Sequence, residues 1–437
     1  MITTQKHNLP VFRLRFKDVH GNDYPDWEMK SFGDCYEFKP TNSFSRNKLN
    51  YEAGQVYNIH YGDIHTKFKH RFELSHEDVP FINMDIDLKN ISEENFCKEG
   101  DLIIADASED YADIGKTIEI ISSNGEKILA GLHTLLARLS NKELYIGYGA
   151  YMISCESVRK QIKIIAQGIK VLSISAGRMK KIRIPIPSFE EQQKIASFLA
   201  SVDNKIEQFG KKKALLEQYK KGIVQKLFSQ ELRFKDVHGN NFPEWEKKPL
   251  REFVQLNRKI TYGIVQPGKF VEKGIPLVRG GDYSFGWVPL SQIKCVTKEI
   301  DQPYKRSKLQ SGDLLLTIVG ANTGTVAVVP DWLSGANITQ TTARIAINNI
   351  QADSSFVKQC LLSSIGQKEV RKYVKGAAQP GLNLSDVEKF MINAPSLPEQ
   401  KKIADFLSAL DKRIDLIATA LKHAQIFKKG LLQKMFI

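Results

Sequence analysis

The chain has 437 residues and carries 63 lysines and arginines against 49 aspartates and glutamates, a formal net charge of +14. This excess indicates a polyanionic partner, either nucleic acid or an anionic membrane surface. No apolar run reaches 18 residues, which excludes a membrane-spanning helix. The length predicts two to four domains.

Secretion and disulfide chemistry are also disfavoured. The opening residues MITTQKHNLP lack the features of a signal peptide. The five cysteines are odd in number and widely separated, with neither zinc spacing nor a disulfide framework. We therefore expect a cytoplasmic protein that holds its thiols reduced.

A 15-residue motif occurs twice. Residues 14–28 read LRFKDVHGNDYPDWE and residues 232–246 read LRFKDVHGNNFPEWE, with 12 of 15 positions identical at an offset of 218. The His-Gly-Asn steps predict a turn. Trp27 and Trp245 are interpreted as packing anchors, with base stacking as the alternative.

The end of this motif superficially resembles a nuclease site. Glu28 and Lys30 form an acidic–basic pattern within PDWEMK. Metal-binding carboxylates in such sites come from separate strands, whereas these crowd into one turn. We therefore expect no metal site here.

Two globular units follow, at roughly 30–185 and 247–393, and short runs of β-forming residues dominate both. The runs in the first unit are QVYNIHYGDI, GDLIIADA, KTIEII and ELYIGYGAYMI, and those in the second are GIPLVRGGDY, GDLLLTIVG, GTVAVVP and TARIAI. Gly100-Asp101 in the first unit answers Gly312-Asp313 in the second. The two units share these matching segments, but the sequence between the segments differs. This suggests that the units have the same fold and recognise two different targets.

Each unit is followed by a long predicted helix. Residues 187–228 match residues 395–436 at 17 of 42 positions, with an offset of 208 and no gap. Apolar residues recur at steps of three and four, the pattern of a coiled-coil seam. The seam positions are Ile195, Leu199, Val202, Ile206, Phe209, Ile223, Ile403, Leu407, Leu410, Ile414, Ile417 and Leu431.

The predicted helices have distinctive ends and interruptions. Ser188 and Ser396, each followed three residues later by glutamate, predict capping boxes. Lys220 and Lys428 interrupt the seam and are expected to fix register at some cost in stability. Glycines near the seam's end suggest close helix approach or a kink. The alternative is two independent amphipathic helices, each packed on its own domain.

The repeats have a circular order. The motif at 232–246 directly follows the first long helix, whereas the motif at 14–28 follows none. Joining the chain's end to its start would restore the pattern. This pseudo-symmetry predicts that the N-terminus lies near the distal end of the second long helix.

Several catalytic signatures are missing. There is no Walker A loop, no complete dinucleotide-binding fingerprint, and no Asn-Pro-Pro-aromatic stretch of the kind amino-methyltransferases use. We therefore expect neither a catalytic site nor a metal or cofactor bound by this chain.

The repeated start of the two long helices resembles that of a known family. The repeat Pro-Ser-x-x-Glu-Gln-x-x-Ile-Ala-x-x-Leu, at 187–199 and 395–407, is similar to that of specificity subunits of Type I restriction–modification enzymes. The resemblance implies that each unit is a target recognition domain for half of a bipartite DNA sequence. It also implies that the paired helices set the distance between the halves.

The resemblance further implies partners that carry the chemistry. Two modification subunits would bring S-adenosylmethionine and methylate adenine N6, and restriction subunits would bring ATP-driven translocation and cleavage with Mg²⁺. The specificity subunit itself would not be catalytic. The alternative is a standalone bivalent DNA-binding protein; a single-chain nuclease is a third reading.

The expected fold is α+β, with two pseudo-symmetric mixed α/β recognition domains separated by two long helices that pair as an antiparallel coiled coil. The expected boundaries are 1–185, 186–230, 231–394 and 395–437. Polar and basic residues in loops are candidates for DNA contact. They are Asn42, Ser45, Arg46, Lys48, Tyr61, Lys67, Lys69, Arg258, Lys259, Tyr262, Gln266, Lys269, Arg279, Asn322, Thr339 and Gln340.

Overall fold

The computed structural model describes residues 14–140, 143–376 and 378–436. The chain divides into two compact units, of which unit 1 comprises Met1–Phe209 with Ala420–Ile437 and unit 2 comprises Gly210–Thr419. Each unit therefore contains one part of each long helix. The four domain boundaries expected from the sequence stay a prediction.

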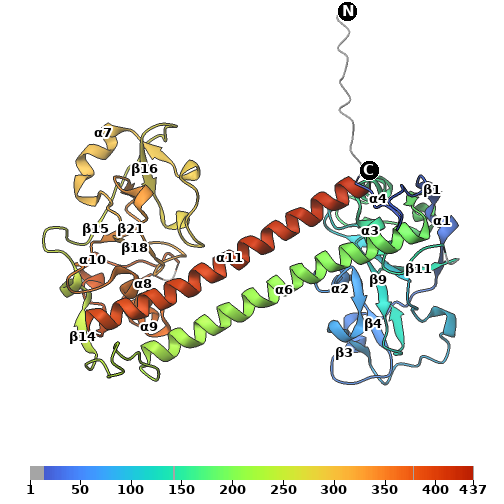
Figure 1. The fold of residues 1–437 in the computed structure, drawn as a ribbon, viewed down its shortest axis with the longest axis horizontal. Helices are drawn as coiled ribbons and strands as arrows, with labels where there is room; N and C mark the ends of the chain where they lie inside the picture. The colour runs from blue at the N-terminus through green and yellow to red at the C-terminus, as the bar shows by residue number, and fades with distance from the viewer. Residues whose placement is uncertain (1–13, 141–142, 377, 437) are drawn as a thin grey trace, which may run out of the picture. The chain divides into compact units, whose positions relative to one another are not determined.

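Unit 1 is built on a five-stranded sheet and a four-stranded sheet (Figure 1). The order in the larger sheet is β2-β11-β7-β9-β5, and in the smaller it is β10-β4-β6-β3. Its strands are β1 (Glu28–Ser31), β2 (Tyr36–Lys39), β3 (Leu49–Asn50), β4 (Tyr57–Ile59), β5 (Arg71–Glu73), β6 (Phe81–Ile82), β7 (Leu102–Ala105), β8 (Ala107–Ser108), β9 (Thr117–Ser122), β10 (Ile128–Ala130), β11 (Thr134–Leu139), β12 (Leu172–Ser173) and β13 (Arg183–Ile186). Its helices are α1 (Phe32–Cys35), α2 (Tyr61–Thr66), α3 (Gly149–Ser154), α4 (Glu156–Ile165), α5 (Ala176–Met179) and the first part of α6 (Phe189–Phe228).

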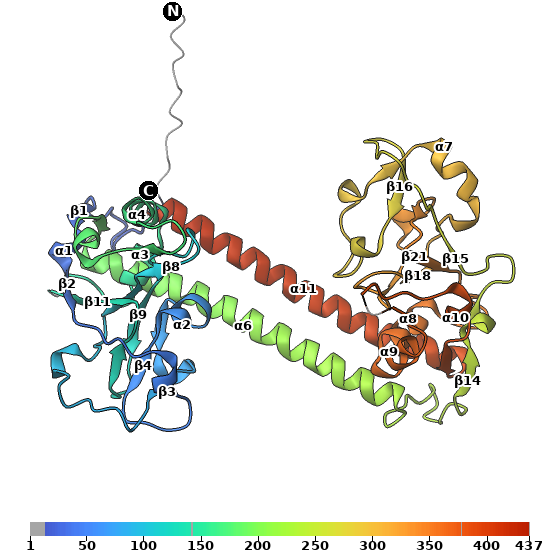
Figure 2. The ribbon, with the colours of Figure 1, turned by 180° about the vertical axis from the view of Figure 1, so that it is seen from behind.

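Unit 2 has a four-stranded sheet ordered β15-β21-β18-β19 and a three-stranded sheet ordered β17-β16-β20 (Figure 2). Its strands are β14 (Glu246–Pro249), β15 (Thr261–Tyr262), β16 (Ile275–Val278), β17 (Cys295–Val296), β18 (Leu314–Thr317), β19 (Val326–Val328), β20 (Asn337–Ile338), β21 (Thr342–Ile345) and β22 (Met391–Ala394). Its helices are α7 (Lys298–Asp301), α8 (Ser354–Leu362), α9 (Ser364–Arg371), α10 (Leu384–Val387) and the first part of α11 (Leu397–Met435).

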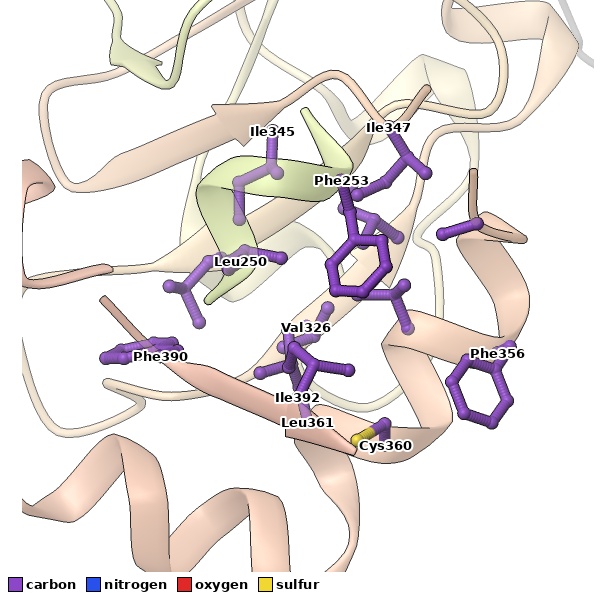
Figure 3. Close-up of a cluster of buried hydrophobic side chains, with 14 of the residues drawn as sticks. Leu250, Phe253, Val326, Ile345, Ile347, Phe356, Cys360, Leu361, Phe390 and Ile392 are labelled. Atoms are coloured by element: carbon purple, nitrogen blue, oxygen red, sulfur yellow. The ribbon is translucent and has the colours of Figure 1, made fainter. Parts of the chain in front are cut away.

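The main core of unit 2 joins the sheet to the helices. Figure 3 shows Phe253, Ile345 and Ile347 packed with Phe356 and Leu361 of α8. Leu227 of α6 and Ile403 of α11 belong to the same buried cluster. Burial of these apolar groups is the main stabilising contribution in the unit.

In both units the repeated motif is attached to a long helix by the same arginine–glutamate and tryptophan–glutamate bonds, which we call the joint. In unit 1 the fully buried carboxylate of Glu191 accepts hydrogen bonds from Arg15 at 2.7 Å and from the indole of Trp27 at 2.9 Å. In unit 2, Arg233 and Trp245 donate to Glu399 at 3.0 and 3.2 Å. The tryptophans are therefore packing anchors, as predicted. Each repeated motif binds the first turn of a long helix.

The circular order predicted from the repeats is seen from Leu14 onward, while the N-terminus itself lies outside the described residues. The backbone N–H of Leu14 donates to the carbonyl of Lys434, at the end of α11, at 2.9 Å. In unit 2, Leu232 makes the corresponding bond to Lys226 of α6 at 3.1 Å. The start of the described chain thus packs on the distal end of the second long helix.

Within each unit, a part of α6 lies antiparallel to a part of α11. In unit 1, Asp203 pairs with Lys428 at 2.6 Å, and in unit 2, Lys220 pairs with Asp411 at 2.5 Å. Both seam lysines therefore meet an aspartate on the other helix. The two helices are not independent of each other, because each contributes to the core of both units.

Burial along the seam follows the domains. Six of the predicted seam residues are buried, and they lie where a domain covers the helices: Ile195, Leu199, Ile403, Leu407, Ile414 and Leu431. The other six are half-buried: Val202, Ile206, Phe209, Ile223, Leu410 and Ile417. Val202, Ile223 and Leu410 still pack against a domain core, whereas Ile206, Phe209 and Ile417, near the middle of their helices, belong to no core cluster of the described residues.

Two details of the helix prediction were wrong. Ser188 accepts from Glu191 N, but the Glu191 carboxylate binds Arg15 and Trp27 instead of closing the box, and the hydroxyl of Ser396 has no hydrogen-bond partner, so the two-way bonding of a capping box is seen at neither helix. A Cβ added at Gly222 or Gly430 would meet nothing within 4 Å, which contradicts close helix approach at these glycines. Both helices also run through them without interruption.

Two of the β-type runs contain helices instead. In QVYNIHYGDI the strand ends at Ile59 and α2 begins at Tyr61, where His60 accepts from the N–H of Gly62. In ELYIGYGAYMI the second half is α3, in which the N–H of Ala150 donates to the buried carboxylate of Glu119. A short apolar run does not distinguish a buried strand from a buried helix.

Among the described residues, no helix is both long and apolar enough to cross a membrane. All five cysteines are unpaired, and four of them are buried. Burial raises the pKa of Cys360 to about 12, which keeps this thiol protonated and unreactive.

Candidate nucleic-acid interface

In unit 2, one edge gathers polar side chains at the carboxyl ends of two parallel strands. β16 and β20 pair in parallel, with Val278 opposite Ile338. The residues that follow them, Arg279 and Thr339, therefore emerge side by side, and Thr339 N donates to Val278 O at 3.1 Å. We call this the carboxyl edge of unit 2.

Three further predicted residues reach the same edge. Gln340 is exposed, and its N–H donates to the carbonyl of Ile264 at 3.0 Å. Gln266 follows Ile264 by two residues, so its backbone lies close to the same edge. Asn322 follows β18, and its amide donates to Ser284 at 3.0 Å. Arginine, glutamine and asparagine are the side chains that pair with guanine and adenine edges.

Arg279 is held in place. Its guanidinium lies 2.9 Å from the carboxylate of Asp282, which also accepts the backbone N–H of Arg279 at 2.8 Å. The Arg279 side chain is still 42% exposed. A guanidinium fixed on one side and open on the other suits directional contact with a base or a phosphate.

The other candidates of unit 2 lie elsewhere. Arg258 forms a bidentate ion pair with Asp313, at the amino end of β18, and is largely buried. Lys259 precedes β15 and Tyr262 lies on it, with the guanidinium of Arg306 5.8 Å from the Tyr262 ring. Lys269 is exposed on the following loop. Tyr262 is followed by Gly263, whose N–H donates to Thr339 O at 3.3 Å. The DNA contacts of these four residues stay predictions.

Unit 1 repeats the arrangement with different side chains. β4 and β10 pair in parallel, with Ile59 opposite Ala130. The turn after β4 reads His60-Tyr61-Gly62-Asp63, where unit 2 has Arg279-Gly280-Gly281-Asp282 after β16. We call this the carboxyl edge of unit 1.

Four predicted residues lie at this edge, and two of them pair with the buried carboxylate of Asp63. Arg46 lies 2.7 Å from it, and Lys67 lies 3.6 Å from it and 2.8 Å from the hydroxyl of Tyr51. Tyr61 is half-buried at the start of α2. Asn42 donates to the last carbonyl of β10, at Ala130, at 3.0 Å.

Three candidates of unit 1 are less central. Ser45 bonds Asn47, and Lys48 lies over the ring of Phe44, both on the loop that precedes β3. Lys69 lies 2.9 Å from Glu207 of α6. Lys69 therefore faces the helix in this structure and not the carboxyl edge.

A cluster of histidines at this edge was missed from the sequence. His133 has a left-handed backbone, with φ 55°, and its ring packs on Tyr61 at 5.2 Å. Burial and the charge of Arg46 lower the pKa of His60 to about 4, so this imidazole is neutral and accepts from Gly62. A non-glycine residue with positive φ marks a locally strained turn. Only tertiary structure brings these residues together.

Within the described ranges, no three histidine, cysteine, aspartate or glutamate side chains are grouped so as to hold a metal ion. Glu28 lies at the start of β1, and Lys30 lies 2.7 Å from Glu143. The geometry of both edges suits recognition by hydrogen bonds.

Comparisons of the sequence and of the structure with known proteins point to the same group of proteins. Residues 24–218 and 243–425 match the family model described as "Type I restriction modification DNA specificity domain". The specificity subunit of the Type I restriction enzyme EcoBI of Escherichia coli is 28% identical over 283 residues, 61% of this chain and 59% of the relative. The chain thus spans about three fifths of the length of that relative.

A second relative matches along nearly its whole length. The putative Type I restriction enzyme MjaX specificity subunit of Methanocaldococcus jannaschii is 26% identical over 432 residues, covering 95% of this chain and 94% of the relative. The crystal structure of the S subunit of a Type I restriction–modification system from M. genitalium has a TM-score of 0.62 at 15% identity. It covers 98% of this chain and 99% of that chain. At this identity, the likeness shows the fold.

Proposed function

The chain belongs to the family of Type I restriction–modification DNA specificity domains, and we propose that it is the specificity subunit that reads a two-part, asymmetric DNA target. Each unit reads one half of that target through its carboxyl edge. The excess of positive charge supplies the sequence-independent attraction to phosphates.

One observation carries this proposal. The turn after the parallel strand keeps its Gly-Asp step in both units but carries His60 and Tyr61 in unit 1 and Arg279 in unit 2. The scaffold is thus constant, while the groups that it presents to a ligand differ. Different hydrogen-bonding groups on one scaffold support recognition of two different half-sites.

The chemistry belongs to other polypeptides. We infer that two modification subunits, which carry S-adenosylmethionine and methylate adenine N6, and restriction subunits, which use ATP and Mg²⁺, assemble with this chain. The missing catalytic signatures in the sequence support this division of labour. A cytoplasmic location follows from the same assignment.

The test is to map methylated adenines across the host genome, with the natural chain and with a chain in which residues 247–393 come from a relative. The natural chain should give a two-part motif with a gap of constant length. The exchange should change one half and leave the other half intact. A one-part motif, or a change in both halves, would contradict independent reading by two units.

A further inference from the structure

One aromatic side chain at the carboxyl edge of unit 2 lies outside the core of the fold. Phe285 is 100% exposed. It lies at the tip of the loop that runs from Arg279, after β16, to Trp287. Its ring gains nothing from folding, since apolar surface stabilises the folded state only when it is removed from water.

The loop that carries Phe285 is fixed on both sides. Before the tip, Tyr283 is 4% exposed, and its hydroxyl hydrogen-bonds Thr317 at the end of β18, 2.9 Å away. After the tip, the indole of Trp287 donates to Val328 O at 3.1 Å and packs against Trp332. The exposed ring is therefore held at a defined position.

Contacts of the tip also tie it to the candidate base readers. Ser284, the residue before Phe285, donates to Gly280 O at 2.7 Å and accepts from Asn322 at 3.0 Å. Gly286, the residue after it, has φ 96°, a conformation that lets the chain reverse. Phe285 thus belongs to the same surface as Arg279 and Asn322.

We propose that Phe285 is a specificity-determining residue that reads one base pair by apolar contact, in the half-site recognised by unit 2. Arg279, Asn322 and Gln340 can recognise base edges by hydrogen bonds, whereas the exposed ring of Phe285 offers apolar surface. In the major groove, thymine alone among the four bases presents a methyl group, and phenylalanine is among the side chains that contact it. The inference rests on the proposed function, because it assumes that this edge meets DNA bases.

The chain offers a matched control. Leu256 is 95% exposed and lies in unit 2. Its neighbour Gln255 bonds Ala346 and Ile347, next to the amino end of β18, whereas Phe285 lies at the carboxyl end. Removing either side chain takes nothing from the core, so neither variant should change folding.

The experiment introduces F285A, F285L and L256A at the chain's own locus in the host and maps methylated adenines genome-wide. F285A should relax one thymine-containing position in one half of the motif, with methylation at sites carrying other bases there rising about tenfold. F285L, which keeps an apolar side chain, should show a smaller change. L256A should reproduce the natural motif.

Two results would overturn the proposal: a motif in F285A identical to that of L256A, or a uniform loss of methylation with no position relaxed. Failure of the proposed function would look different, because the natural chain would then yield no two-part motif. Equal unfolding temperatures for the purified variants would show that the substitutions act on recognition and not on folding.

Discussion

The ammonium group of Lys428 lies 2.6 Å from a carboxylate oxygen of Asp203, and this ion pair holds α11 against α6 within unit 1. The same carboxylate accepts from the hydroxyl of Tyr151 at 2.7 Å and lies 3.1 Å from His70. Lys220 and Asp411 occupy the equivalent positions in unit 2, at the offset of 208 that relates the two helices. The seam lysines therefore select one register.

Replacing Lys428 with methionine should destabilise unit 1, because it leaves Asp203 partly buried without its counter-charge. A fully buried pair would cost roughly 3–5 kcal/mol, and we expect about 2 kcal/mol for this partly exposed one. K220M is the matched control, since Lys220 and Asp411 are more exposed. Thermal unfolding should show a larger loss for K428M. Equal losses would contradict the role of burial.

Acid should weaken the same cluster. Burial alone would raise the pKa of Asp203, but His70 and Lys428 together lower it to about 2, below the usual 3.8. The stabilisation is therefore present above about pH 4 and is lost as the pH falls toward 2, a change of about 2 kcal/mol. The difference in stability between the natural chain and D203N should be large at pH 5 and small near pH 2.5. A difference that does not vary with pH would contradict this assignment.

The two arginine–glutamate joints should each stabilise their own unit. E191A leaves Arg15 and the Trp27 indole without a buried acceptor, and E399A does the same to Arg233 and Trp245, at a cost of roughly 3 kcal/mol each. Hydrogen exchange should rise in residues 14–28 for the first variant and in residues 232–246 for the second. D26A is the control for E191A, because Asp26 is fully exposed and only 3.6 Å from Arg15. Exchange that rises in both segments would contradict independent joints.

Two exposed residues of unit 2 should differ in how they affect DNA binding. Q340A removes a candidate base reader at the carboxyl edge and should reduce discrimination at one position by about 1–3 kcal/mol. K259A, placed away from that edge, should weaken binding to all sequences alike and lower the salt slope by about one. Anisotropy titrations against the mapped motif and single-position variants, at several salt concentrations, separate the two outcomes. Identical behaviour of the two variants would contradict the placement of the interface.

G222A and G430A should stabilise the chain. The structure has open space where each Cβ would be added, and alanine exceeds glycine in helix propensity by about 1 kcal/mol. Each variant should unfold at a higher temperature than the natural chain. A decrease would mean that another backbone does approach these glycines closely.

Sequence alone predicted the features that repetition encodes. The offset of 208 aligned the two long helices, and the offset of 218 aligned the motifs that brace them, so the order along the chain placed the first motif near the end of the second helix, where Leu14 bonds Lys434. Antiparallel pairing was expected from the family resemblance. The true role of Glu191 was hidden, because a glutamate three residues after a serine also fits a capping box. Its partner Arg15 is 176 residues away.

The interface was predicted less well, since it depends on which strands pair. Arg279 and Thr339 are neighbours only because β16 and β20 run in parallel, and no short-range pattern reports that pairing. Arg258 was chosen because it lies in a polar, basic stretch, but its guanidinium forms an ion pair with Asp313. His133 carried no signal in the sequence, because its unusual backbone is imposed by the turn between β10 and β11.

The duplicated joint has a consequence for how new variants of this protein arise. Arg15 with Glu191, and Arg233 with Glu399, depend on short constant segments at the borders of each globular unit, not on its interior. Recombination within those segments would therefore exchange one interior, because the residues that make the bracing contacts lie in the repeated segments on either side of it. Under the proposed function, such an exchange would replace one half of the DNA target in a single genetic event and leave the other half as it was.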